Sequence, residues 1–178
     1  MKGLLKNPLI RFLLIASSLY LLWYVIYEFY LKINTAFDDV VINNLVYLSK
    51  KILLFFGYEL VVYSEIAYQN IVQIKESLGV TIGAPCDGIV LLALFTVFIM
   101  SFPGPSKHKL WFLPLGLMSI HLINVLRIVS LAIIVDINPA WLEFNHDYTF
   151  TILVYAFVFF LWYIWVNKFS PLKASQNV

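Results

Sequence analysis

The residues Leu110–Val135 read LWFLPLGLMSIHLINVLRIVSLAIIV, and so long an apolar run predicts a helix that spans a membrane. Three further apolar runs, at 9–31, 86–102 and 148–166, predict three more crossings. The whole chain is 62% hydrophobic and only 12% charged, a composition that excludes a soluble globular domain. We therefore expect residues 1–178 to form one all-α membrane domain with about four transmembrane helices.

The basic residues predict the orientation of these helices. Lysine and arginine occur without acidic neighbours at the amino terminus, in the loop Pro103–Lys109 and after Asn167. By the positive-inside rule both termini and that loop face the cytoplasm, so the segment 32–85 and the loop Asp136–Asn145 face outward. The first run is too long for a signal-peptide core and has no small-residue cleavage site after it, which indicates a retained anchor.

The long outward segment has two parts with different patterns. Apolar residues recur at helical spacing across Thr35–Phe56 but are interrupted by charges and amides, which predicts an amphipathic helix lying on the outer leaflet. The alternative, in which 37–57 spans the membrane, would move the following residues to the cytoplasmic side. The stretch Tyr58–Ile82 is rich in valine, isoleucine and tyrosine, with a polar break at Gln69-Asn70, and predicts a small extracytoplasmic β-hairpin.

Charge and cysteine content exclude several classes of function. The formal net charge of +2 is too small to indicate a nucleic-acid partner. A single cysteine cannot form an intramolecular disulfide, and it also argues against a structural zinc cluster. We expect no metal and no cofactor. The thiol therefore serves either packing or chemistry.

That cysteine, Cys86, stands between Pro85 and Asp87-Gly88 where an apolar run begins. We therefore expect it in the first turn of a span. A helix amino terminus favours a thiolate over a thiol, so this position would activate the sulfur. Gly88 removes a side chain where a substrate backbone would approach, whereas the carboxylate of Asp87 raises a thiol pKa unless a cation offsets it. The alternative is a small buried hydrophobic residue without chemistry.

Arg127 is the cation that could offset Asp87. It lies eight residues before Val135, about 12 Å below the outer end of its helix. An arginine inside a span costs about 2.5–3.5 kcal/mol, so its neighbours must stabilise it. The spacing of three residues places it on one polar ridge with His121, Asn124 and Ser130. The ridge serves either to bond neighbouring helices or to aim a guanidinium into a water-accessible site, where it stabilises a thiolate or an oxyanion.

His146 opens the last span and is the histidine best placed to exchange protons there. Histidine titrates near neutral pH, and Asp147 or Glu143 would orient or repel its ring. The alternative is an interfacial histidine without a role. His121 lies deeper, too far down to share a site easily with Cys86, and His108 falls on the cytoplasmic side of the predicted topology.

Three residues from successive crossings thus meet near the outer membrane boundary: Cys86, Arg127 and His146. A nucleophile, a cation and a base are the groups that nucleophilic acyl transfer requires.

In order, spacing and membrane side, these residues resemble the exosortase and archaeosortase family of membrane cysteine transpeptidases. The resemblance covers the carboxy-terminal half and rests on Cys86-Asp87-Gly88, Asn124-Val125-Leu126-Arg127-Ile128 and His146. Asp87 stands where many members have serine, and the short chain looks like the short members found in Bacteroidetes-type bacteria.

The resemblance implies a sorting enzyme of the bacterial inner membrane with its active site on the periplasmic face. Its substrates would be membrane-anchored proteins whose carboxy-terminal tail combines a short motif, a transmembrane helix and a basic end. Cys86 would form the acyl-enzyme, His146 would handle protons and Arg127 would stabilise the tetrahedral charge. An acceptor in the envelope, a lipid or a glycan, would release the cargo.

Two other classes of protein fit parts of the same pattern. Asp87 and Asp147 could share a proton as an intramembrane aspartyl peptidase. A non-enzymatic assembly subunit for envelope polysaccharide export would use the polar ridge only to bond helices.

Overall fold

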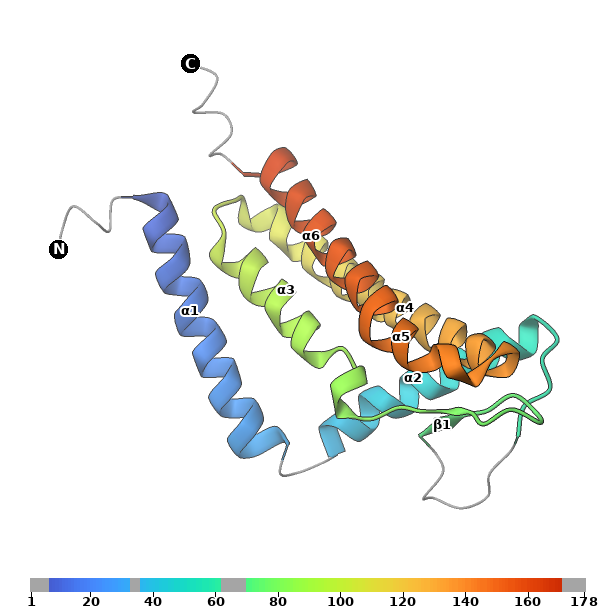
Figure 1. Ribbon diagram of the computed structural model, residues 1–178. Coiled ribbons are helices and arrows are strands. Elements are labelled where there is room, and N and C mark those ends of the chain that lie inside the picture. The colour runs from blue at the N-terminus through green and yellow to red at the C-terminus, as the bar shows by residue number, and fades with distance from the viewer. Residues whose placement is uncertain (1–6, 33–35, 62–69, 171–178) are drawn as a thin grey trace. The chain divides into compact units, whose positions relative to one another are not determined.

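The computed structural model describes residues 7–32, 36–61 and 70–170 (Figure 1). These residues are mostly helical and include one small two-stranded antiparallel sheet, as the sequence predicts. The chain divides into two compact units. We call them the helical unit (Met1–Ile33, Ile89–Ile120, Ala156–Val178) and the sheet unit (Asn34–Gly88, His121–Tyr155).

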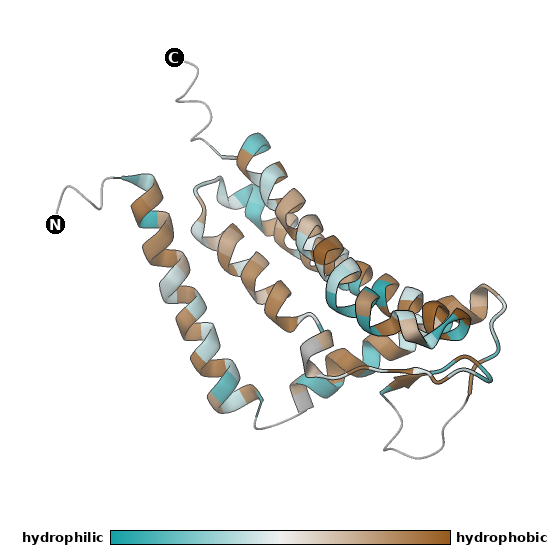
Figure 2. Cartoon of the chain, in the orientation of Figure 1, coloured by the Kyte–Doolittle hydropathy of each residue, from teal (hydrophilic) through white to brown (hydrophobic). Residues whose placement is uncertain are grey.

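In the described part of the chain, three helical stretches are long and apolar enough to cross a membrane. Figure 2 shows that hydrophobic residues predominate along the helices. The first combines α1 (Pro8–Ile26) with the π-helix η2 (Tyr27–Leu31), the second is α4 (Ser106–Ile137), and the third runs through η5 (Pro139–Trp141), α5 (Leu142–Phe144), η6 (Asn145–Thr149) and α6 (Phe150–Lys168). The remaining predicted crossing, 86–102, is represented by α3 (Ile89–Ser101). That helix is apolar, but its 13 residues rise only about 20 Å.

Aromatic packing holds the helical unit together. Phe12 of α1 meets Phe98 of α3 edge to face, with ring centroids 5.4 Å apart, and Phe98 stacks on Trp162 of α6 at 4.4 Å. A β-carbon at Gly116 of α4 would fall 2.2 Å from Cζ of Phe95, so glycine is what allows this ring to lie against the α4 backbone. These contacts pack α1, α4 and α6 around the short apolar α3.

The core of the sheet unit lies between α2 (Ala36–Phe55), the sheet and residues of α4. Leu45 and Leu53 of α2 are fully buried in it, as is Val125 of α4. The prediction of a helix over Thr35–Phe56 is confirmed, and its placement on the outer leaflet stays a prediction. The alternative span at 37–57 is not supported, because α2 is not among the helices apolar enough to cross a membrane.

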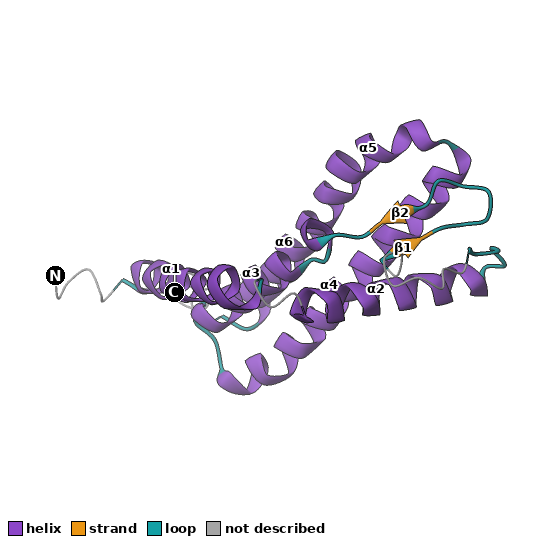
Figure 3. Ribbon diagram, turned by 90° about the horizontal axis from the view of Figure 1, so that it is seen from below, coloured by secondary structure: helices purple, strands orange, loops and turns teal. Residues whose placement is uncertain are grey.

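The sheet consists of β1 (Ile71–Val72) and β2 (Val80–Thr81), paired antiparallel (Figure 3). An isolated antiparallel bridge between Leu60 and Ile74 pairs a further segment with the residues that follow β1. The side chain of Asn70 donates a hydrogen bond of 3.1 Å to the carbonyl of Ile82, which ties the two ends of the hairpin together. The prediction of a hairpin within Tyr58–Ile82 is confirmed for its second half, and residues 62–69 of that stretch lie outside the described residues.

Replacing Leu53 with alanine tests the core of the sheet unit. The side chain is fully buried, so Leu53→Ala is expected to lower Tm by at least about 5 °C through the cavity that it leaves. The matched control is Leu54→Ala, because Leu54 is 53% exposed and its loss should shift Tm by less than about 2 °C. Tm is measured on the purified protein in detergent. Equal shifts for the two variants would contradict the packing of α2.

Candidate active site

Cys86 and His146 lie in direct contact. The Sγ atom of Cys86 is 2.9 Å from Nε2 of His146, and the two residues are 60 positions apart in the chain. Cys86 ends the short 3-10 helix η4 (Ala84–Cys86), and its N–H donates to the carbonyl of Gly83. The α-helix α3 begins only at Ile89, so the prediction that Cys86 occupies the first turn of the span is wrong.

Asp147 fixes the orientation of the histidine ring. Its Oδ1 atom lies 2.7 Å from Nδ1 of His146. A carboxylate only accepts hydrogen bonds, so Nδ1 carries the proton that it donates to Asp147. The lone pair of Nε2 then faces the thiol of Cys86 and can accept its proton. The three side chains form the sequence nucleophile, base and orienting carboxylate that activates a thiol.

A π-helix holds His146 in place. The wide turn η6 (Asn145–Thr149) leaves the carbonyl of His146 able to accept hydrogen bonds from side chains. The hydroxyl of Thr151 donates to this carbonyl at 3.0 Å, and Nη2 of Arg127 donates to it at 3.5 Å. Sequence reasoning missed Thr151, because nothing in one sequence marks a π-helix in an otherwise apolar run.

Arg127 and Asn124 reach the site from α4. Arg127 is 9% exposed and Asn124 is 1% exposed. Nδ2 of Asn124 donates a 3.0 Å hydrogen bond to the carbonyl of Cys86, so the amide holds the loop that carries the thiol. Within the described part of the chain, Nε of Arg127 is buried and has no hydrogen-bond partner. A buried guanidinium N–H without a partner is a donor ready for a negatively charged oxygen.

Gly88 has a different role from the one that the sequence indicates. Its φ angle is +81°, a conformation that side-chain-bearing residues rarely adopt, and a β-carbon there would lie 3.0 Å from Nδ2 of Asn124. The space beside Gly88 is thus occupied by the Asn124 amide rather than kept open for a substrate backbone. Glycine lets Asn124 bond the Cys86 carbonyl.

The electrostatic surroundings of Cys86 keep its sulfur protonated. Burial raises the pKa of the thiol above its usual value, the charge of Arg127 lowers this pKa, and Asp87 and Asp147 raise it. The opposing effects of Asp87 and Arg127 agree with the sequence analysis, but the expectation of a resting thiolate is wrong because burial dominates. A neutral thiol needs a base within reach, and His146 supplies one.

The polar ridge on α4 divides between two sites. Nε2 of His121 lies 2.8 Å from Oδ1 of Asn44 on α2, so this histidine bonds two helices. It does not contact Cys86, in agreement with its predicted deeper position. Asn124 and Arg127 instead contact the backbone of Cys86 and His146, so the helix-bonding interpretation holds for His121, and the chemical role of Arg127 stays a prediction.

A cavity of about 550 Å³ borders the imidazole. Residues of β2 and η5 line it together with residues of α5 and η6. Its polar side chains are those of Thr81, Glu143, His146 and Asp147. Its size suits a short peptide or a headgroup-sized molecule. Within residues 7–32, 36–61 and 70–170, no group of three or more His, Cys, Asp or Glu side chains is placed to hold a metal ion.

Comparison with protein-family models, with curated proteins and with solved structures found no match. Fold and site therefore define this chain only as a helical protein, with helices of membrane-spanning length, that carries a Cys-His-Asp constellation.

The pH dependence of thiol alkylation tests the electrostatics of Cys86. Because the pKa is raised, the alkylation rate is expected to keep increasing with pH beyond the point at which an ordinary thiol, with a pKa of about 8.5, levels off. Asp87→Asn should lower the pKa and speed alkylation at pH 7, whereas Arg127→Gln should raise the pKa and slow it. The measurement is the rate with a neutral reagent from pH 6 to 10, and unfolded protein is the control, in which all variants should react alike. Slower alkylation of Asp87→Asn would contradict the assignment.

Proposed function

We propose that this protein is a membrane cysteine transpeptidase that acts like the exosortases it resembles. The observation that carries the proposal is the contact of 2.9 Å between Sγ of Cys86 and Nε2 of His146, whose Nδ1 bonds Asp147 at 2.7 Å. Its substrates are membrane proteins with a carboxy-terminal tail of a short motif, a transmembrane helix and a basic end. The acceptor is a lipid or glycan of the envelope.

The first half-reaction forms a thioester. Nε2 of His146 takes the proton of the Cys86 thiol while Sγ attacks the carbonyl carbon of the scissile peptide bond. The oxyanion that develops is stabilised by the positive charge of Arg127, whose buried Nε has no hydrogen-bond partner among the described residues. When the C–N bond breaks, the imidazolium returns the proton to the leaving amine, and the cargo remains on Cys86 as a thioester.

The second half-reaction transfers the cargo to the acceptor. A hydroxyl or amine of the acceptor attacks the thioester carbonyl as His146 removes its proton, and Cys86 leaves as the thiol. The cavity that borders His146 and Asp147 supports this step, because a second reactant can approach the imidazole there.

The proposal places the protein in a bacterial inner membrane with four crossings and the site on the periplasmic face. The basic residues near Pro8 and in Pro103–Lys109 put both segments in the cytoplasm. Because the first span leaves that side, the chain has to return through α3 before it reaches the loop. The 13 residues of α3 are short for a crossing, so the bilayer thins there or flanking residues complete the passage.

The geometry favours a thiol mechanism over an aspartyl peptidase. Asp147 is engaged with Nδ1 of His146, a bond that orients a base for the thiol. An aspartyl dyad instead requires two carboxylates that share a proton. The absence of any peptide-bond cleavage by the protein would instead favour the non-enzymatic assembly subunit.

Capture of an acyl-enzyme tests the proposal. The probe is an epitope-tagged protein from the same genome whose last thirty or so residues form the three-part tail, coexpressed with the transpeptidase. We expect an adduct on Cys86 that neutral hydroxylamine releases. Cys86→Ala should abolish it, and His146→Gln should reduce its formation at least about a hundredfold. His121→Gln is the matched control and should leave it unchanged, because His121 bonds Asn44 instead of the thiol.

Asp87→Asn separates the alternatives in the same assay. Tail cleavage that survives Cys86→Ala but stops with Asp87→Asn would establish the aspartyl peptidase. Cleavage that none of these variants alters would overturn the enzyme proposal and favour the assembly subunit.

Labelling in intact cells tests the orientation. A membrane-impermeant thiol reagent added outside is expected to label Cys86, the only cysteine of the chain, once the outer envelope is permeable to it. The control is Lys107→Cys in a Cys86→Ala background, because this loop should be labelled only after the inner membrane is opened. The reverse result would place the site in the cytoplasm.

A further inference from the structure

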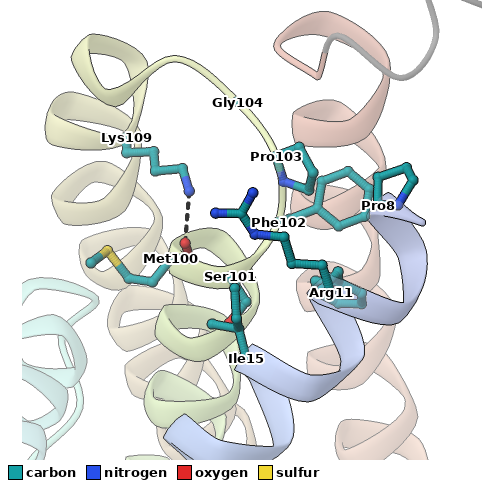
Figure 4. Close-up of a pocket in the computed structure, with 10 residues that line it drawn as sticks. Pro8, Arg11, Ile15, Met100, Ser101, Phe102, Pro103, Gly104 and Lys109 are labelled. Atoms are coloured by element: carbon teal, nitrogen blue, oxygen red, sulfur yellow. Dashed lines mark hydrogen bonds between the residues drawn. The ribbon is translucent and has the colours of Figure 1, made fainter. Parts of the chain in front are cut away.

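A second cavity, of about 560 Å³, lies in the helical unit (Figure 4). It is lined by α1, by the end of α3 with the loop that follows it, and by the first turn of α4. Arg11 and Lys109 bring two cations to its wall, while Phe12, Ile15 and Met100 contribute apolar surface. Among the described residues, no acidic side chain lines this cavity.

One of the two cations is held at the end of α3. Nζ of Lys109 donates a hydrogen bond of 2.7 Å to the carbonyl of Met100. A lysine at a helix carboxy terminus is favourable by itself, so part of its role is structural. An ammonium group has three N–H donors, however, and this bond uses one of them.

The other cation lacks any such partner. Arg11 is exposed on α1, and no carboxylate of the described residues forms an ion pair with it; the salt bridges that do form involve Lys32, Lys75 and His146. Figure 4 shows its guanidinium extended toward the ammonium of Lys109. Two like charges that face one cavity repel each other, and an anion between them removes that repulsion.

We propose that this cavity binds the phosphate of an anionic membrane phospholipid such as phosphatidylglycerol. The planar guanidinium of Arg11 matches phosphate oxygens in a bidentate manner, and Lys109 adds a second charged donor. The cavity lies where the spans Pro8–Leu31 and Ser106–Ile137 begin. Helices of this length reach from one headgroup region of the bilayer to the other, so their first residues lie among the lipid headgroups.

The apolar part of the lining favours a lipid over a free phosphate ion. Phe12, Ile15 and Met100 offer contact to the glycerol backbone and the upper acyl chain, which a soluble anion lacks. Basic pockets between transmembrane helices are the common form of anionic headgroup sites. This inference stands independently of the proposed transpeptidase activity.

Native mass spectrometry of the detergent-purified protein tests the site with equal amounts of phosphatidylglycerol and phosphatidylcholine. We expect retention of phosphatidylglycerol to exceed that of phosphatidylcholine about tenfold and to fall about fivefold in Arg11→Gln. Arg11→Gln leaves the bond between Lys109 and Met100 intact, so the end of α3 keeps its contact. The matched control is Lys107→Gln, a basic residue of the same loop that does not line the cavity.

Three results would overturn the proposal. The first is equal retention of the two lipids. The second is an equal loss in Lys107→Gln, which would indicate only an effect of general surface charge. The third is displacement of the lipid by inorganic phosphate at about 50 mM, which would indicate a site for soluble anions. An unchanged Tm of Arg11→Gln in lipid-free detergent confirms that the variant is folded.

Discussion

The hydrogen bond from the Asn124 amide to the Cys86 carbonyl joins the thiol loop to α4, and the rest of the site depends on it. Its donor, Asn124, is buried, so water has little access to that end of the bond. It forms because Gly88 has a positive φ and no side chain, which brings the two groups within 3.0 Å. The same helix carries Arg127, one turn further on, so the position of the sulfur and that of the cation are set by a single rigid element.

A different feature of the backbone places His146 beside the sulfur of Cys86. His146 lies in the π-helix η6, and its carbonyl accepts hydrogen bonds from the side chains of Thr151 and Arg127. Arg127 thus contributes twice, by its charge near the sulfur and by a bond to the backbone that carries the base. Cys86 is anchored through Asn124 and His146 through Arg127, and both anchoring residues belong to α4, so the distance between sulfur and imidazole does not rely on the long chain segments between them.

Periodicity and charge were sufficient to predict a mostly helical chain with a small hairpin, and they singled out Cys86, Arg127 and His146, whose functional roles stay predictions. Arg127 could be identified because a cation inside an apolar run is costly and must be stabilised by its neighbours. Cys86 and His146 could be identified because they lie where such runs begin. What could not be predicted lies in backbone detail. The φ of Gly88 delays the start of α3 to Ile89, and the π-helix brings Thr151 to the histidine. Burial, which determines the sign of the thiol pKa shift, depends on packing that one sequence does not reveal.

The protonated state of Cys86 bears on how long its sulfur would survive on the periplasmic side that the proposed function assigns to it. Oxidants attack the thiolate far faster than the thiol, and an isolated cysteine has no second thiol in the chain that could trap its sulfenic acid as a reducible disulfide before further oxidation makes the damage irreversible. Because burial raises the pKa of this sulfur, it spends most of its time in the form that resists oxidation. The neighbouring imidazole lies 2.9 Å away and can take the proton when the reactive form is needed, so the proposed function is compatible with a lone thiol in an oxidising compartment.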